Sequence, residues 1–241
     1  VGTHAIIQND VEFNRLGLVI TDEQHRFGVN QRAMLSAKAL NPHVMVMSAT
    51  PIPRTLALMI YGDLDISILD ELPPGRQPIE TFVINSKIRE RAFGYIKKHL
   101  DEGRQGYIVC PLVSDENDDD NSNKIAAENY KDELSENQFK GYSVGLLHGK
   151  MKSSEKEDVM RKFASGQIQL LVSTTVIEVG VDVPNSVIMM IENADLFGLS
   201  QLHQLRGRVG RGKRKSYCVL VSDSQGESAR ARLETIRTTY D

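Results

Sequence analysis

The sequence predicts an α/β fold in which a mostly parallel β-sheet is covered by helices on both faces. Short apolar runs rich in β-branched residues recur along the chain, and such runs are typical of strands buried on both sides. Amphipathic stretches of helical length separate many of these runs. Polar segments follow several of them, where the carboxyl ends of parallel strands bind ligands. This alternation predicts βαβ units.

Two strands are predicted in the first part of the chain, at residues 16–21 and 43–47, and we expect both to be buried on both faces. Helices are expected at residues 30–40 and 54–61. Three prolines and a glycine then fall within residues 73–78, and they form the best connector in the sequence. We therefore place two domains at residues 1–75 and 76–241.

The second part continues the alternation. One helix is predicted to be capped by Ser86, and another to open with a capping box of Ser154 and Glu157 and to end near Gly166. A third helical stretch is expected around residues 123–137. Strands are predicted at residues 79–84, 106–113, 142–147, 168–172, 187–191 and 216–221.

The bulk composition limits the function. A formal net charge of −3 gives no global field toward nucleic acid, so polyanion binding has to come from local patches. Cys110 and Cys218 each lie inside an apolar run, which favours buried reduced thiols over a disulfide or a metal pair. No run approaches the ~20 apolar residues of a membrane span, and no signal peptide opens the chain. We expect a cytosolic protein, and we interpret the chain as a piece of a longer one.

Asp22 and Glu23 end the first predicted strand. Two adjacent carboxylates can divide labour, one holding Mg²⁺ and the other activating a water. An ordinary turn after a strand can carry the same pair. Ser48-Ala49-Thr50 ends the next strand and is compatible with either a relay of hydroxyls or a simple helix cap.

A basic run lies near the end of the chain, from Arg206 to Lys215, with Arg208 and Arg211 among its cations. Planar guanidinium groups clamp phosphate oxygens well, and interspersed glycines allow close approach. A solvated basic loop is the simpler interpretation of the run taken alone. The segment 173–185 offers hydroxyls and amides suited to phosphates, and His148 ends another strand.

The succession of these motifs resembles superfamily 2 helicases, motors built from two RecA-like domains with ATP between them. Asp22-Glu23-Gln24-His25 is similar to their Walker B box and Ser48–Thr50 to their third motif, while 173–185 and 204–211 are similar to their fifth and sixth. Residues 2–5, 22–29, 48–55 and 70–76 are similar in particular to the RecG family, which remodels branched DNA in recombination and repair.

The resemblance implies a set of roles. Asp22 would hold Mg²⁺ through water, Glu23 would activate the hydrolytic water, and Arg208 and Arg211 would be arginine fingers on the γ-phosphate of ATP. The resemblance also implies nucleotide-binding or coupling roles for Gln24, His25, Ser48, Thr50, Asp182 and Gln204. It implies contacts with the backbone of branched or double-stranded DNA for Thr3, His4, His148, Thr174 and Thr175, in the bacterial cytoplasm.

The chain departs from that family in two respects. It contains no Gly-x-x-x-x-Gly-Lys-Ser/Thr loop, which cradles the phosphates, and no N-terminal wedge domain. Residues 1–75 would then be the tail of the first motor domain, and the chain alone should hydrolyse almost no ATP. Two alternatives stay open: the motor of a transcription-repair coupling translocase, and a catalytically silent module that binds nucleic acid.

Overall fold

The computed structural model describes residues 2, 4–8, 10–22, 34, 38, 42–48, 65–69, 71, 75–111, 122–174 and 182–239, with the backbone alone at 4 and 122–126. The chain divides into two compact units, Val1–Asp70 and Glu71–Asp241. Each is described by itself. The division falls a few residues before the predicted boundary at 75/76, whose assignment to two motor domains stays a prediction.

The first unit contains a 3₁₀ turn, η1 (His4–Ile7), and two parallel strands, β1 (Leu18–Thr21) and β2 (His43–Val46). Both strands were predicted. Their burial on both faces was wrong. In β1, Leu18 and Ile20 are 55% and 53% exposed while the alternate residues are buried. In β2, Met45 is 50% exposed and the alternate residues are only partly buried. Among the described residues, only one face of this two-stranded sheet is packed. The helices expected at 30–40 and 54–61 lie essentially outside the described residues.

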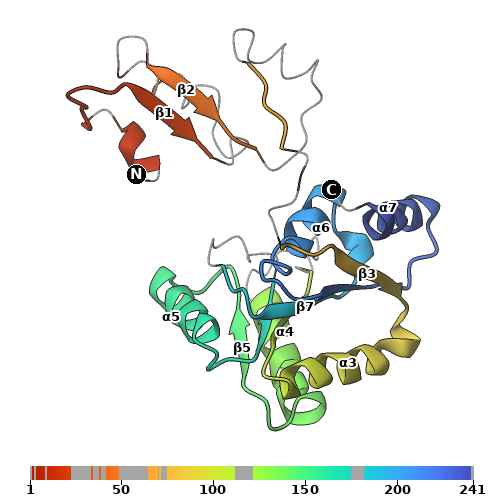
Figure 1. The fold of residues 1–241 in the computed structure, drawn as a ribbon. Coiled ribbons are helices and arrows are strands. Elements are labelled where there is room, and N and C mark those ends of the chain that lie inside the picture. The colour runs from red at the N-terminus through yellow and green to blue at the C-terminus, as the bar shows by residue number, and fades with distance from the viewer. Residues whose placement is uncertain are drawn as a thin grey trace. The chain divides into compact units, whose positions relative to one another are not determined.

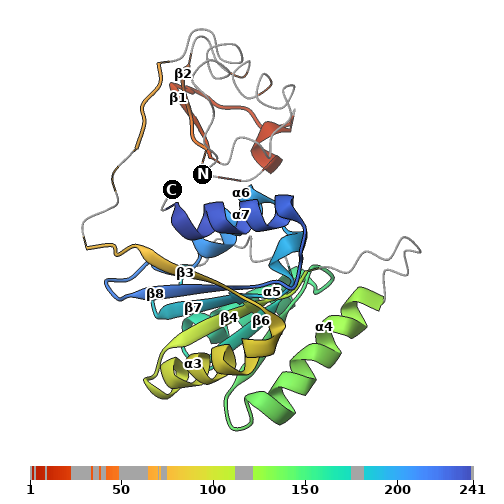
Figure 2. The same ribbon diagram turned by 90° about the vertical axis from the view of Figure 1, so that its right-hand side faces the viewer.

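The second unit is built on a six-stranded sheet in which every pairing is parallel. The spatial order is β3-β8-β7-β4-β6-β5, so β3 and β5 form the edges (Figures 1 and 2). The strands are β3 (Ile79–Ile84), β4 (Gln105–Val109), β5 (Val144–Leu147), β6 (Leu170–Ser173), β7 (Ser186–Ile191) and β8 (Ser216–Val221). The predicted α/β class with a parallel sheet is confirmed.

Helices cover both faces of this sheet. The helical segments are η3 (Ser86–Ile88), α3 (Arg89–Asp101), α4 (Ser122–Glu133) with a π-turn η4 (Leu134–Gln138), α5 (Ser153–Ala164), η5 (Ala194–Leu196), α6 (Leu199–Arg206) and α7 (Glu227–Thr238). Helices α5, α6 and α7 pack on one face, and α3 with the end of α4 and η4 on the other.

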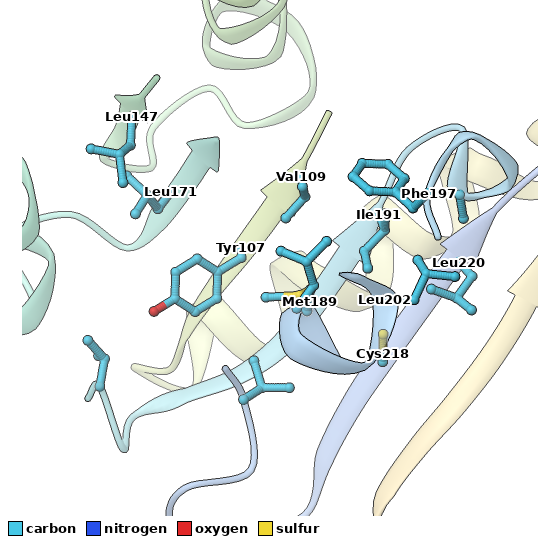
Figure 3. Close-up of a cluster of buried hydrophobic side chains, with 14 of the residues drawn as sticks. Tyr107, Val109, Leu147, Leu171, Met189, Ile191, Phe197, Leu202, Cys218 and Leu220 are labelled. Atoms are coloured by element: carbon cyan, nitrogen blue, oxygen red, sulfur yellow. The ribbon is translucent and has the colours of Figure 1, made fainter. Parts of the chain in front are cut away.

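Side chains of successive strand residues alternate between the two faces. Tyr107 and Val109 join the cluster beneath α5, α6 and α7, while Ile108 joins the cluster beneath α3. Figure 3 shows the first cluster, with Met189 and Cys218 from the neighbouring strands. Both faces of the central strands are thus closed to water, which explains why their sequences are continuously apolar.

The cysteines are free thiols, as the sequence predicted. Cys218 is fully buried and Cys110 is partly buried. Burial raises the pKa of each thiol to about 12, so both stay protonated at neutral pH.

Two predicted helix caps were wrong. Ser86 lies in the 3₁₀ turn before α3, and its N–H donates to Asp223 Oδ1 at 2.9 Å. Helix α5 begins at Ser153, so Ser154 is already helical, and the capping contact runs from the Lys152 N–H to Glu155 Oε2 at 2.9 Å. This is one half of a capping box, two residues before the predicted pair, because a lysine side chain cannot accept the reciprocal bond from the Glu155 N–H.

Within the described residues, no helix combines the length and apolar character that a bilayer crossing requires. Nor do three or more metal-ligating side chains gather anywhere in that part of the chain.

Candidate functional site

The predicted site residues of the second unit divide between two opposite edges of its sheet. Because all six strands are parallel, the loops that precede them share one edge, here the amino edge, and the loops that follow them share the other, the carboxyl edge. Asp182 precedes β7, and Arg208 and Arg211 precede β8. His148 follows β5 and Thr174 follows β6. The structure therefore separates residues assigned to the nucleotide from residues assigned to DNA.

The amino edge is dominated by residues 207–215, which we call the basic loop. It leaves α6, whose first turn is closed by a hydrogen bond from the Gly198 N–H to Gln201 Oε1 at 2.9 Å. Leu202 and Leu205 bury the inner side of the helix, and within the loop Val209 is fully buried. The loop is thus anchored by apolar side chains, while Arg208 is partly buried and its later cations, from Arg211 to Lys215, are exposed.

Two glycines of the basic loop lie where a side chain would not fit. Gly210 has φ +74°, and a Cβ there would come within 2.8 Å of Ile79 Cγ1. A Cβ on Gly212 would come within 2.8 Å of the Pro184 carbonyl oxygen. The loop therefore lies directly against the start of β3 and the turn before β7.

Arg206 has a structural role, which the sequence reasoning missed by including it in the basic run. The side chain is 4% exposed, and its Nη1 donates to the carbonyls of Ile236 at 2.6 Å and Thr239 at 2.7 Å. These carbonyls lie at the end of α7, where helices leave acceptors without intrahelical donors. Arg206 thus fastens α7 to α6.

Arg211 and Asp182, two of the residues that the resemblance singled out, lie close to each other. Arg211 Nε donates to the Gly207 carbonyl at 3.2 Å and lies 3.7 Å from Asp182 Oδ1. The two side chains are 33% and 53% exposed, so the ion pair is solvated and contributes at most ~1 kcal/mol. A more highly charged anion can therefore compete with Asp182 for this guanidinium.

Arg208 shares this neighbourhood. Burial raises the pKa of the Tyr107 phenol, and the positive charges of Arg208 and Arg211 act against that rise. Both guanidinium groups thus act on one buried hydroxyl. Gln204 lies on α6, four residues before Arg208, and is partly buried.

At the carboxyl edge, Thr174 and His148 are 3% and 7% exposed. Thr174 Oγ1 is buried and makes no hydrogen bond within the described residues. The His148 N–H donates to Met151 Sδ at 3.4 Å. In this conformation neither side chain is presented at the surface, and their contact with DNA stays a prediction.

The carboxyl edge also holds a polar cluster that sequence reasoning did not find. Arg89 Nε donates to Glu192 Oε1 at 2.9 Å, and Arg89 Nη2 donates to the Tyr130 hydroxyl at 2.5 Å. The Tyr130 hydroxyl in turn donates to Glu192 Oε1 at 2.7 Å. Burial, and then the Glu192 carboxylate, raise the pKa of Tyr130, so the phenol stays a proton donor. The cluster lines a cavity of about 260 Å³.

In the first unit, Asp22 directly follows β1 and Ser48 lies two residues after β2. The strands are parallel with Thr21 opposite Val46, and the Met47 N–H donates to the Thr21 carbonyl at 2.8 Å. Asp22 and Ser48 thus lie at the same edge of the small sheet, both exposed. His4 begins η1. Predicted site residues outside the described part of the chain are Thr3, Glu23, Gln24, His25, Thr50 and Thr175.

The parallel sheet and the basic loop after α6 are features of a helicase motor domain. Residues 91–213 match the family described as the helicase conserved C-terminal domain, and the chain belongs to this family.

Proteins named ATP-dependent DNA helicase RecG are similar along the whole chain. The relative from Synechocystis is 56% identical over all 241 residues, which cover 29% of that protein, and the relative from Bacillus subtilis is 51% identical, with 35% of its length covered. The RecG-type resemblance expected from the sequence is confirmed. The chain spans about a third of the length of these curated relatives.

Solved structures agree with this assignment. A structure of RecG bound to a three-way DNA junction superposes with a TM-score of 0.79 at 45% identity, covering 100% of this chain and 30% of that chain. A structure of S. cerevisiae Dbp5 bound to RNA and ADP BeF3 gives a TM-score of 0.65 at 16% identity, covering 98% of this chain and 61% of that chain. The second likeness shows the fold alone.

Proposed function

We propose that this chain is the C-terminal part of the motor of a RecG-type helicase. In the whole protein, ATP hydrolysis would drive translocation on branched DNA, such as forks and junctions, in the bacterial cytoplasm. Support comes from the similarity to RecG along the full chain and from the RecG structure whose bound DNA is a three-way junction. Residues 1–75 would complete the first motor domain and residues 76–241 would form the second.

The observation that carries the proposal is the state of Arg211. A guanidinium on a loop anchored by buried Val209, oriented by the Gly207 carbonyl and with its carboxylate partner solvated 3.7 Å away, is prepared to meet a more highly charged partner. With Arg208 beside it, Arg211 would stabilise the charge that develops on the γ-phosphate during hydrolysis. Asp182 and Gln204 would hold the two arginines in place between turnovers.

The first unit would supply the metal side of the reaction. Mg²⁺ in nucleotide sites takes one or two carboxylates and keeps several waters. The exposed Asp22 carboxylate at the end of β1 fits that requirement, with the Ser48 strand beside it. The bound metal would neutralise charge on the phosphates. Glu23 would activate the attacking water, and Gln24, His25, Ser48 and Thr50 would couple the nucleotide state to the rest of the motor.

The DNA contacts would lie elsewhere. Through His148 and Thr174, the carboxyl edge of the second unit would face the DNA backbone, and the resemblance adds Thr175 to these contacts. Thr3 and His4 would contribute contacts from the first unit. Their hydroxyl and ring donors suit phosphate and sugar oxygens, which fix position on DNA without reading its sequence.

The arginine assignment can be tested in the full-length protein. Arg208→Ala and Arg211→Ala should each lower DNA-stimulated ATP turnover by ~10³-fold or more, because each removes charge stabilisation made in the transition state. Binding of a fluorescent ATP analogue should change little. Arg91→Ala, on the exposed side of α3, is the matched loss of one positive charge.

Wild-type turnover in both variants would contradict the assignment. The chain on its own is the negative control for ATP turnover, because its sequence contains no phosphate-cradling loop. DNA binding by the full-length protein without any turnover would favour the silent module instead.

A further inference from the structure

The segment that leads into β3 runs beside the basic loop. Strands β3 and β8 pair in parallel from their first residues, with Ile79 opposite Ser216 (Figure 2). Residues 75–78 immediately precede β3, and the basic loop immediately precedes β8. Since both segments enter adjacent strands in the same direction, the pairing itself brings them together at the amino edge.

Direct contacts join the two segments. Arg76 Nε donates to the Gly210 carbonyl at 3.1 Å, although the two residues are 134 positions apart. Next to this bond, Ile79 packs against the bare α-carbon of Gly210. A Cβ on Gly75 would lie 3.8 Å from Lys213 Cγ. A hydrogen bond from a guanidinium is charge-assisted, and it is stronger than one between neutral groups.

Gly210 lies between the two proposed arginine fingers. Its buried neighbour Val209 fixes the loop from inside, and the absence of a side chain lets its backbone reach Ile79. The carbonyl bond from Arg76 adds a polar restraint to this apolar support. The orientation of the backbone between Arg208 and Arg211 therefore depends on a side chain of the segment before β3.

We propose that Arg76 is a positioning residue for Arg208 and Arg211, linking the geometry of the fingers to the connector that joins the two units in sequence. The inference rests on the proposed function, because it requires the two arginines to act on the nucleotide. In this role Arg76 needs no contact of its own with phosphate or DNA. It acts through the Gly210 carbonyl, so that a change in the connector at Arg76 is passed to the backbone between the fingers.

The test compares Arg76→Ala and Arg76→Lys in the full-length protein. Because small displacements of catalytic groups cost up to ~10²-fold, Arg76→Ala should lower kcat for DNA-stimulated ATP hydrolysis by about 10-fold to 100-fold. KM for ATP should change by less than about twofold, because the loss falls on transition-state contacts. Arg76→Lys should recover part of kcat, since an ammonium can still donate to a carbonyl.

A double variant separates positioning from general damage. If Arg76 acts through the fingers, Arg76→Ala combined with Arg211→Ala should slow turnover by less than the product of the two single effects. Arg91→Ala controls for the loss of one charge. In the chain described here, Arg76→Ala should also speed hydrogen exchange at the amides of the basic loop, with little change in β4 and β7.

The outcomes distinguish the two ideas. Full turnover in Arg76→Ala, alongside loss in Arg211→Ala, would overturn the role of Arg76 and leave the proposed function intact. Full turnover in both Arg208→Ala and Arg211→Ala would overturn the proposed function and this inference with it. Unchanged exchange in the basic loop of Arg76→Ala would overturn the structural link.

Discussion

The two edges of the large sheet use the same pair of chemical groups in different ways. At the carboxyl edge, Arg89 and Glu192 lie 2.9 Å apart, and the glutamate side chain is 10% exposed. At the amino edge, Arg211 and Asp182 lie 3.7 Å apart, and the aspartate side chain is 53% exposed. Each arginine is about one third exposed. The difference therefore lies in the carboxylate partner and its surroundings.

The contrast separates an arginine that the protein itself pairs closely from one that would remain available to the proposed phosphate ligand. Glu192 receives a second hydrogen bond from Tyr130, so the carboxyl-edge cluster satisfies itself. The Arg211–Asp182 pair at the amino edge is instead partly exposed to solvent on both side chains. A cation that is already well paired inside the protein has less to gain from a phosphate, and the weakly paired one has more.

The largest difference between the two edges is expected in the free energy of unfolding when Arg89 and Arg211 are removed one at a time. Arg89→Met should destabilise the chain by about 3 kcal/mol, because it leaves the buried Glu192 carboxylate without its cation. Arg211→Met should change stability by less than ~0.5 kcal/mol. Urea denaturation of both variants gives the comparison. Equal losses would show that the two pairs do not differ in structural role.

A second test asks how much the close packing of Gly210 against Ile79 contributes to the stability of the amino edge. Gly210→Ala should cost ~2–3 kcal/mol, because φ +74° is strained for alanine and its Cβ meets Ile79. Gly103 has the same φ of +74°, but nothing lies within 4 Å of its would-be Cβ, so Gly103→Ala should cost only ~1 kcal/mol. Thermal unfolding of the pair isolates the contact with Ile79, and identical costs would rule that contact out.

Acid should affect the two edges in separate pH ranges. On α3, toward the amino edge, burial lowers the pKa of His99, with Lys98 and Arg104 acting the same way and Glu102 opposing. The rings of Tyr95 and Tyr217 pack against it. A lowered pKa means that the folded state favours neutral imidazole. Its contribution is present above about pH 6.5 and is lost as the pH falls below that value.

At the carboxyl edge, the Ser86 hydrogen bonds lower the pKa of Asp223, so its contribution is lost only below about pH 4. Stability measured from pH 7 to 5 should therefore fall less steeply in His99→Gln, while Asp223→Asn alters the slope near pH 4 and below. This is the smallest expected effect. A His99→Gln variant that keeps the wild-type slope between pH 7 and 5 would remove His99 as its source.

The sequence predicted the structure well where that structure depends on residues that are close together along the chain. The apolar runs predicted β3 and β8 to the residue, and Gly103 and Gly166 mark the ends of α3 and α5 with positive φ. Period and turn chemistry are local, so they can be read from one chain. The exposure of one face of β1 could not be predicted in this way, because it depends on which other segments pack against the strand.

The candidate site followed the same division. The resemblance singled out Asp182 and Arg211 separately, and the structure places the two side chains 3.7 Å apart, while their roles toward the nucleotide stay a prediction. In the sequence Arg206 could not be distinguished from the other cations of the basic run. In the structure it is buried and bonds to carbonyls at the end of α7, because its position on α6 brings it within reach of them. Arg76 and Glu192 escaped notice since their partners lie 134 and 103 residues away.

The pairing of β3 with β8 has a consequence for how the second unit is made. The strand that begins this unit pairs with a strand whose first residue comes 137 positions later, from Ile79 to Ser216. Closing so long a loop costs little extra stability, because each doubling of loop length adds only ~0.6 kcal/mol, but contacts of this separation slow folding. During synthesis β3 therefore waits without its partner until β8 has been made. Arg76 can reach Gly210 only after that late pairing forms.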